Sequence, residues 1–288
     1  MANPEIEAID ILLQEKMPNR AVITKEKKEK VEKIKPKDYQ NYLEVSFNKP
    51  RINLNRTNTI SNGNYTIFMK DNGEGYSKYN DILINRFKVT RDYKQGIFFY
   101  LKNVKNGRIW TNTPIDNIDE SKIIFAPERD EFERIDAGIK TTTKIITAPD
   151  DAVEIRRLKI KNTGITEETL EVTSFLEPVL STARQDYAHM AFNNLFLSYE
   201  KTENEEIIIK RNKRGLNEKD IYLGGAFYTE NETIGQLEFE VDKEKFWGNI
   251  QNLIPKKVKE SKPLSKNLGL VTDSCLAIIK KLLINWKK

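Results

Sequence analysis

The sequence predicts a large antiparallel β-sandwich that follows a short helix and a charged linker. From about residue 42 onward, short runs rich in Thr, Ile, Val, Phe and Tyr recur about every 8–14 residues and are separated by turn residues. No helical repeats alternate with these runs, which favours antiparallel strands over βαβ units. The chain of 288 residues contains 13 Phe, 11 Tyr and 3 Trp, enough aromatic residues to build a core although 32% of the residues are charged.

The first forty residues differ from the rest of the chain. The stretch "NPEIEAIDILLQEKMP" predicts a helix over 3–17, because Asn3 can cap it, Pro4 suits the first turn and apolar residues recur at helical spacing. Residues 24–37 are dominated by Lys and Glu and predict a solvated linker or exposed helix. We therefore expect an N-terminal segment over 1–40 and a sandwich domain over 41–288.

The strand-like runs follow one another along most of the second segment. In "GIFFYLKNVKNGRIWT" two apolar runs flank Asn-Gly, the strongest two-residue hairpin signal. Residues 242–253 are charged and aromatic and predict a turn or short helix. The later apolar run fits either a helix over 273–283 or a turn and a final strand over 278–285. The remaining expected strands lie in "NYTIFMK", "GIKTTTKIITAP", "AVEIRRLKIKNTG", "ETLEVTSFLEPVL", "LFLSYE", "EEIIIKRN" and "DIYLGGAFYTE".

The composition excludes several classes of site. A single cysteine, Cys275, cannot form an internal disulfide or a thiolate metal site and is expected to fill the core. The single histidine, His189, rules out a multi-histidine metal centre, and any Ser-His-Asp triad would have to include it. We expect no metal and no cofactor.

Charge and hydropathy also limit which partners and which location we expect. The net charge of +5 is spread along the chain, which argues against nucleic acid as a partner. No signal peptide and no apolar run of about 18 residues is present, so we expect a cytoplasmic chain with no membrane partner.

The loop "DNGEGYS" over 71–77 allows three interpretations. A phosphate loop would need a further glycine or a Gly-Lys-Ser/Thr sequence, and both are lacking. A tight turn would need a positive φ at Gly73 or Gly75. A sugar-facing loop would use backbone N–H groups, polar side chains and a tyrosine ring, because a pyranose has a polar rim and a weakly apolar face.

A second polar stretch, "ARQDYAHMAFNNLFLSYE", surrounds His189. This histidine either has a structural hydrogen-bonding role or orients a substrate hydroxyl. The acidic clusters "DNIDE", "PERDE" and "PDD" lie in very polar stretches, where a solvated carboxyl keeps its ordinary pKa and is a weak general acid. In the second cluster, Glu128 and Asp130 predict a surface turn before a strand. We expect no catalytic residue in the chain.

Long stretches of the sequence resemble a known family. "ISNGNYTIFMKDNGEGYSKYNDILINRFKVTRDYKQGIFFYLKN", "IFAPERDEFERIDAGIKTTTKIITAPDDAVEIRRLKIKNTG" and "AHMAFNNLFLSYE" are similar, in this order, to the β-sandwich region of the cyclic β-1,2-glucan synthases and cellobiose phosphorylases. This is glycoside hydrolase family 94, formerly glycosyltransferase family 36. The leading "LLQEKMPNRAV" and the tail "PLSKNLGLVTDSCLAI" resemble the synthase branch more closely.

The resemblance implies a galactose-mutarotase-like supersandwich that forms part of a glucan cleft, without the (α/α)6 barrel that carries catalysis in the family. It also implies weak binding of a β-glucan oligosaccharide, in a parent synthase associated with the inner membrane. The alternatives are a homodimerisation or assembly module without sugar affinity, and part of a phosphorylase that acts with a separate (α/α)6 chain. We expect one loop of the cleft to be lined by Asn62, Asn64, Asp71, Gly73, Gly75, Tyr76 and Ser77. Arg86, Arg91 and Asp92 are expected either to orient this loop or to reach sugar hydroxyls, and His189 and Asn193 to meet it from a second loop.

Overall fold

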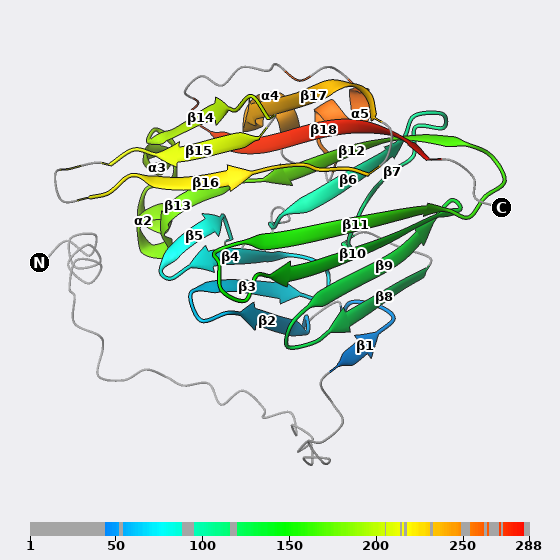
Figure 1. The fold of residues 1–288 in the computed structure, drawn as a ribbon, viewed down its shortest axis with the longest axis horizontal. Coiled ribbons are helices and arrows are strands. Elements are labelled where there is room, and N and C mark those ends of the chain that lie inside the picture. The colour runs from blue at the N-terminus through cyan, green and yellow to red at the C-terminus, as the bar shows by residue number, and fades with distance from the viewer. Residues whose placement is uncertain are drawn as a thin grey trace, which may run out of the picture. The chain divides into compact units, whose positions relative to one another are not determined.

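Figure 1 shows the fold of the protein as a computed structural model. The structure describes residues 44–51, 54–87, 95–115, 120–204, 206–213, 215, 218–230, 233–248, 254–261, 264, 271 and 273–284, and for 233–237, 283 and 284 it describes only the backbone. These residues all belong to one compact unit, Tyr42–Lys288. The helix expected over 3–17 and the linker over 24–37 lie outside the described residues, so the boundary near residue 40 stays a prediction.

The described strands form four antiparallel sheets, which confirms the predicted fold class. The first sheet has the order β1-β8-β9-β10-β11, with bounds Val45–Phe47, Glu120–Phe125, Asp130–Asp136, Ile139–Thr147 and Glu154–Asn162. The second has the order β17-β18-β12-β6-β7, with bounds Thr233–Asp242, Ser274–Ile284, Glu168–Leu176, Phe98–Asn103 and Ile109–Thr111.

The other two sheets complete the sandwich. One has the order β13-β5-β4-β3-β2, with bounds Pro178–Thr182, Ile82–Asn85, Gly75–Tyr79, Tyr65–Lys70 and Thr57–Ser61. The smallest has the order β14-β15-β16, with bounds Leu197–Lys201, Ile207–Arg211 and Ile221–Gly225. Strand β12 of the second sheet leads into β13 of the third sheet through Glu177, so the chain passes directly from one large sheet to another at this residue.

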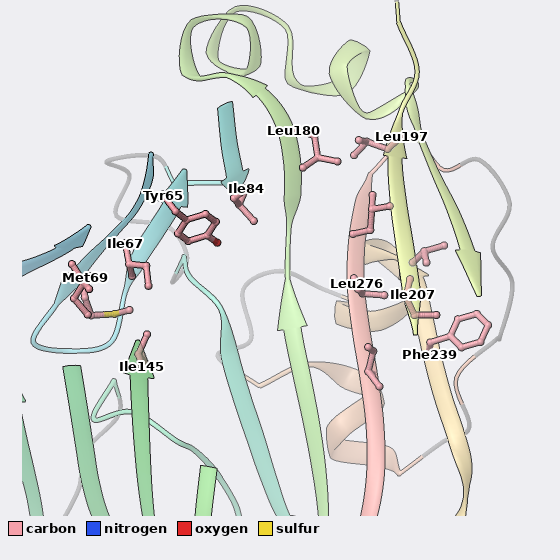
Figure 2. Close-up of a cluster of buried hydrophobic side chains, with 14 of the residues drawn as sticks. Tyr65, Ile67, Met69, Ile84, Ile145, Leu180, Leu197, Ile207, Phe239 and Leu276 are labelled. Atoms are coloured by element: carbon pink, nitrogen blue, oxygen red, sulfur yellow. The ribbon is translucent and has the colours of Figure 1, made fainter. Parts of the chain in front are cut away.

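Alternating residues on the strands build the core. In β3 the side chains of Tyr65, Ile67 and Met69 are buried while their neighbours are half-buried, as expected for a sheet with one face inward. Ile67 and Met69 belong to the same buried cluster as Ile145 of β10, and the same cluster continues to Leu276 of β18 (Figure 2). Because one cluster includes residues of all four sheets, the sheets share a continuous hydrophobic core.

Short helices lie between strands. Two of them, α2 (Ala183–Ala188) and α3 (Met190–Asn194), connect β13 with β14, and two others are α4 (Lys243–Trp247) and α5 (Lys256–Glu260). The side chain of Thr182 accepts from the backbone N–H of Gln185, and the Gln185 side chain reaches back to the Thr182 backbone, forming a capping box at α2. His189 and Asn193 were expected in a second loop, but Asn193 belongs to α3 and His189 lies between the two short helices, because the polar residues of this segment cap and anchor helices.

Several local predictions can be compared with the structure. The hairpin is confirmed as β6 and β7, but its connection is wider than two residues, because the backbone N–H of Asn103 bonds to the carbonyl of Arg108. Residues 274–284 form strand β18, so the helical alternative for this end is wrong. The side chain of Cys275 is buried in the core, as expected.

Candidate functional site

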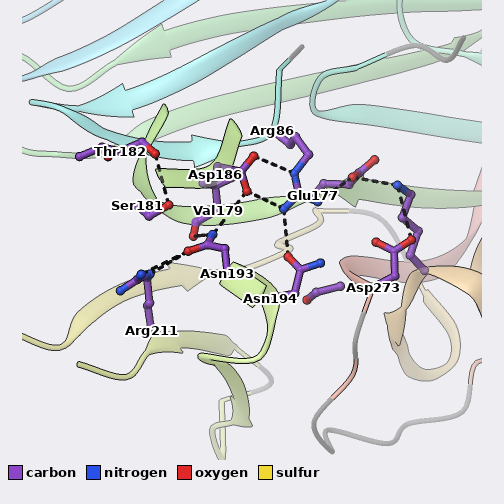
Figure 3. Close-up of polar contacts among 12 residues, drawn as sticks. Arg86, Glu177, Val179, Ser181, Thr182, Asp186, Asn193, Asn194, Arg211 and Asp273 are labelled. Atoms are coloured by element: carbon purple, nitrogen blue, oxygen red, sulfur yellow. Dashed lines mark hydrogen bonds and ion pairs between the residues drawn. The ribbon is translucent and has the colours of Figure 1, made fainter. Parts of the chain in front are cut away.

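A buried guanidinium organises the region around α2 and α3. Arg86 follows β5 and donates from Nε and Nη2 to the two carboxylate oxygens of Asp186 in α2, at 3.0 and 2.9 Å. Its Nη2 also donates to Oδ1 of Asn194 in α3 at 2.9 Å. A guanidinium that holds a carboxylate with two parallel bonds fixes both distance and orientation. Arg86 therefore fixes both helices against the end of β5 (Figure 3).

A second buried carboxylate, that of Glu177, extends this network to the sheet that contains β12. Glu177 lies where β12 passes into β13, and its Oε2 accepts from Arg86 at 3.3 Å and from Nζ of Lys243 at 3.0 Å. Asp273 lies 3.8 Å from the same ammonium group. Arg86, Glu177, Asp186 and Lys243 are all less than a tenth exposed, so these two cations and two carboxylates face each other in a poorly solvated interior, with the more exposed Asp273 beside Lys243.

The side chain of Asn193 also holds the α2–α3 segment in place. Asn193 donates to the carbonyl of Val179 at 3.0 Å and accepts from Arg211 of β15 at 3.2 Å. Near this point β13 has an irregular register, and Leu180 has a φ of +51° although it is not a glycine. A non-glycine residue in this conformation is strained and persists where the surroundings impose it. The α2–α3 segment is thus held by side chains from β5, β12–β13 and β15.

The outer side of this anchored segment carries exposed rings. Tyr187 is 77% exposed, Phe192 is 49% exposed and Leu195 is 48% exposed. His189, which lies between the two helices, is also exposed. His189 was predicted from the sequence, whereas Tyr187 and Phe192 were not predicted as surface rings, and their position beside the sole histidine was the only signal for them in the sequence. The segment combines aliphatic, aromatic and imidazole groups on a rigid base.

The seven residues expected to line one loop of the cleft lie on different parts of the fold. Asn62 and Asn64 lie in the turn between β2 and β3, whereas Asp71 follows the other end of β3. Strand β3 lies between them, and the seven residue steps from Asn64 to Asp71 correspond to about 24 Å of extended chain. Gly75, Tyr76 and Ser77 belong to strand β4. The prediction that all seven residues line one loop is therefore wrong.

Most of these side chains bond to the protein itself. The Asn62 amide donates to the carbonyls of Ala148 and Asp151 at 2.8 and 2.9 Å. The fully buried Asp71 accepts from the Arg51 backbone at 3.0 Å and from Asn55 at 2.7 Å. Figure 3 likewise places Arg86 and Asn193 inside the ion-pair network. These residues position loops and helices, and any contact they make with sugar stays a prediction.

Ser77 and Tyr76, which were also expected to line the cleft, differ in exposure. Ser77 is buried, and its hydroxyl donates to Glu154. The half-buried ring of Tyr76 stacks on Phe68, with ring centroids 5.2 Å apart. Arg91 and Asp92 lie outside the described residues.

The two glycines of the loop meet different neighbours, and Gly73 gives a direct test of the tight-turn interpretation. Gly73 has a φ of +89°, as the turn interpretation required, and a Cβ placed there would lie 2.3 Å from the Thr113 side chain. A Cβ on Gly75 would lie 2.0 Å from the carbonyl oxygen of Phe68. The turn is therefore packed closely against Thr113 and β3, which explains why both positions are glycine.

We expect Gly73→Ala to lower the free energy of unfolding by about 2–3 kcal/mol, because it combines an unfavourable φ with overpacking. Gly107→Ala is the matched control, since Gly107 also has a positive φ, +71°, but open space around it. That control should cost only about 1 kcal/mol. Urea denaturation of both variants measures the difference, and equal losses would show that Thr113 does not constrain the turn.

A separate buried cluster lies between the β2–β5 sheet and the first sheet. Asp130 begins β9 and is fully buried, with Oδ1 accepting from the Asn58 amide at 2.8 Å and Oδ2 lacking a hydrogen-bond partner among the described residues. Burial raises the pKa of Asp130 to about 7, and the negative charge of Glu154 adds to this rise, while Asn58 and Arg156 oppose it. The expectation of a solvated carboxyl with an ordinary pKa was wrong for Asp130, although Glu128 does lie in an exposed turn.

The same cluster contains a paired carboxylate. Glu154 of β11 accepts from the Tyr65 hydroxyl at 3.0 Å and from Arg156, so its oxygens are engaged within the fold. Burial, together with the charge of Glu154, raises the pKa of Tyr65. Within the described part of the chain, no three His, Cys, Asp or Glu side chains come close enough to hold a metal ion. Glu154 and Asp130 therefore connect strands in the interior rather than face solvent.

These observations define a class of protein: a large supersandwich whose described strands all pair antiparallel and whose anchored helical segment carries exposed rings. The chain belongs to the family described as glycosyl hydrolase 94, supersandwich domain, which matches residues 40–287. This match confirms the family resemblance read from the sequence.

Within this family, a curated relative of the chain is a glucan synthase. The chain is 29% identical over 258 residues to the cyclic beta-(1,2)-glucan synthase NdvB of Rhizobium meliloti (strain 1021). The alignment covers 88% of this chain and 9% of that synthase, so the chain spans a small part of its relative's length. No described helix is both long and apolar enough to cross a membrane.

Proposed function

We propose that this chain is a non-catalytic, carbohydrate-associated sandwich domain of a cyclic β-1,2-glucan synthase-like protein, and that its α2–α3 segment contacts the glucan. The observation that carries the proposal is the pair of exposed rings, Tyr187 and Phe192, on helices fixed by buried ion pairs. Membership in the glycosyl hydrolase 94 supersandwich family supports a carbohydrate context.

The chemistry of the segment suits a neutral sugar. A pyranose presents axial C–H groups that pack on an aromatic face, and hydroxyls that need directional donors and acceptors. Tyr187 and Phe192 supply rings, and the exposed His189 between them in sequence supplies an imidazole that can both donate and accept. Because the helices are already ordered, binding does not have to fix them, which lowers its entropic cost.

The buried carboxyls support a binding role over bond cleavage by this chain. A glycosidase needs two carboxyl groups that flank the scissile bond. Asp130 has the raised pKa that a general acid needs, but it is fully buried between two sheets. Asp186 and Glu177 are likewise buried and bonded to Arg86. We infer that catalysis belongs to other polypeptide, such as an (α/α)6 barrel.

We expect the chain to bind β-1,2-gluco-oligosaccharides with a dissociation constant of about 1 mM, near −4 kcal/mol, because water competes for each hydroxyl. Tyr187→Ala or Phe192→Ala should weaken binding about fivefold, the value of one ring contact of about 1 kcal/mol. Nuclear magnetic resonance titration measures the affinity of the wild type and of each variant.

Tyr228→Ala is the matched control, because Tyr228 is 78% exposed and lies outside the α2–α3 segment. Equal binding by all four proteins, or no shift at saturating ligand, would refute sugar contact at α2–α3.

A second function is favoured by Leu195, which adds an exposed aliphatic side chain to the two rings of the segment. Such a mixture also fits protein contact, either with a second copy or with a separate catalytic chain. Light scattering separates the cases: a dimer that Leu195→Asp dissociates, with no response to glucan, supports assembly. A phosphorolysis assay with inorganic phosphate and β-1,2-glucan tests the version in which a partner chain supplies catalysis.

A further inference from the structure

The outer face of β10 and β11 is basic. Side chains alternate across a sheet, so the residues of β11 that point away from the core are Ile155, Arg157, Lys159 and Lys161, all exposed. Strand β10 contributes Lys140 and Lys144 to the same face, and Lys144 is also exposed. The spacing of two residues along β11 places its cations about 7 Å apart in one row.

The register of the two strands places like charges opposite each other. Lys140 pairs with Lys161, and Lys144 pairs with Arg157. Cations directly opposite on one face of an antiparallel pair repel each other and destabilise the sheet. The face therefore carries an electrostatic cost that a negatively charged partner would relieve.

Nearby acids offset this charge only in part. Glu133 of β9 pairs with Lys140 at 2.7 Å. Glu131 of β9 lies opposite Lys144 in the register, and its carboxylate is 3.9 Å from Arg129. Among the residues that the structure describes, no ion pair includes Lys144, Arg157, Lys159 or Lys161. The outward residues of β9, β10 and β11 thus include five cations against two carboxylates.

Protection of a sheet edge does not account for this arrangement. Lysines on an edge strand discourage pairing with another chain, and β11 is the last strand in its sheet. However, β10 lies between β9 and β11, so Lys140 and Lys144 are not on an edge. Their placement opposite further cations points to recognition of an extended anionic surface.

We propose that the outer face of β10 and β11 docks on an anionic lipid bilayer. A broad sheet face can lay a row of cations on a flat, negatively charged surface, where each contributes to adsorption. The apolar pair Ile146 and Ile155 adjoins the cations on the same face and can contact the headgroup region. No membrane partner was expected from the sequence, because it has no signal peptide and no apolar run of about 18 residues, and the pairing of β10 with β11 that gathers these cations is not visible in the sequence.

Nucleic acid fits this face less well. Single strands are held by aromatic side chains on which bases stack, and no aromatic residue lies among the outward side chains of β10 and β11, which are Lys140, Thr142, Lys144, Ile146, Ile155, Arg157, Lys159 and Lys161. Duplex grooves are read by a protruding helix or ribbon, whereas this face belongs to a five-stranded sheet.

Co-sedimentation of the full chain with vesicles tests the proposal. The wild-type protein should sediment with phosphatidylglycerol–phosphatidylcholine vesicles but not with pure phosphatidylcholine vesicles. A triple reversal should lower the partition coefficient by about 100-fold, since each cation near an anionic surface contributes about fivefold. Binding should also be lost near 1 M salt, where the Debye length is about 3 Å. The triple reversal is Arg157→Glu, Lys159→Glu and Lys161→Glu.

A second triple reversal provides the control, because it changes the net charge equally at exposed lysines away from this face: Lys213→Glu, Lys219→Glu and Lys256→Glu. It should retain binding. The β11 variant should fold, since Glu at 157 and 161 replaces repulsion with attraction toward Lys144 and Lys140, and circular dichroism checks this. Equal loss in both variants, no binding to anionic vesicles, or tighter binding to a labelled oligonucleotide than to vesicles would each overturn the proposal.

Discussion

Arg86→Met is expected to lower the free energy of unfolding by about 3–5 kcal/mol, the cost of leaving buried carboxylates without their cation. Methionine keeps much of the side-chain volume, so most of the loss would be electrostatic. Asp186 would lose both of its bonds to the guanidinium, and Glu177 would retain only Lys243. Urea denaturation followed by fluorescence measures the change, and reduced soluble yield is an accompanying sign.

Arg108→Met is the matched control for this result. Arg108 also pairs with a buried carboxylate, Asp136, at 3.5 Å, but its own side chain is 47% exposed and Asp136 keeps its bonds to Arg134. A partly exposed pair contributes less than about 1 kcal/mol. Similar losses for the two variants would show that the Arg86 network is hydrated and does not anchor α2 and α3.

The Arg86 result also bears on the sugar site. From the sequence, Arg86 was expected either to orient a loop or to reach sugar hydroxyls. The structure gives it at most 1% exposure, so a ligand could reach it only if the helices separated. We therefore expect its replacement to act through stability, and expect Tyr187→Ala to weaken binding without a comparable loss of stability. The two variants separate anchoring from recognition.

The strands were predictable because their signal is local. In β3 the side chains of Tyr65, Ile67 and Met69, at every second position, mark the buried face, and in β10 Ile139 and Ile145 do the same. The end of the chain was ambiguous, because the apolar run over 274–284 lacks alternation. Strand β18 lies between β17 and β12 and buries side chains of both faces, which removes the alternation that would have identified a strand.

The site was less predictable because burial of polar residues is a tertiary property. Asp71, Ser77 and Asn193 have side chains that would suit a sugar, yet each is buried and bonded within the fold. The family resemblance also suggested that Asn64 and Asp71 line one loop, although the whole of β3 separates them. Polarity identifies residues that need partners, but only the fold determines whether the partner is the protein or a ligand.

Replacing Asp130 by Asn is expected to change the pH dependence of stability. In the folded protein burial raises the pKa of Asp130 to about 7, from an ordinary value of 3.8. Between these values the unfolded chain has released a proton that the folded protein still holds. The free energy of unfolding therefore falls by about 1.4 kcal/mol per pH unit as the pH rises through this window. The contribution is fully present below pH 3.8, and about 4 kcal/mol has been lost above pH 7.

The D130N variant has no proton to release, so the difference between its stability and that of the wild type isolates this group. This difference should grow in favour of the variant by about 4 kcal/mol between pH 4 and pH 8, whatever constant offset the unpaired amide adds. Asp151→Asn is the control; its site is exposed, and the substitution should change stability by less than about 0.5 kcal/mol.

Urea denaturation at several pH values gives both curves. A difference that stays constant across the range would mean that Asp130 is already ionised in the folded protein, with water or Arg156 neutralising its charge. The expected result would instead show that the junction of β2 with β9, where Asn58 contacts Asp130, is held by a neutral carboxyl group. Because the two strands come from different sheets, the closure of the sandwich would then weaken as the pH rises toward 7.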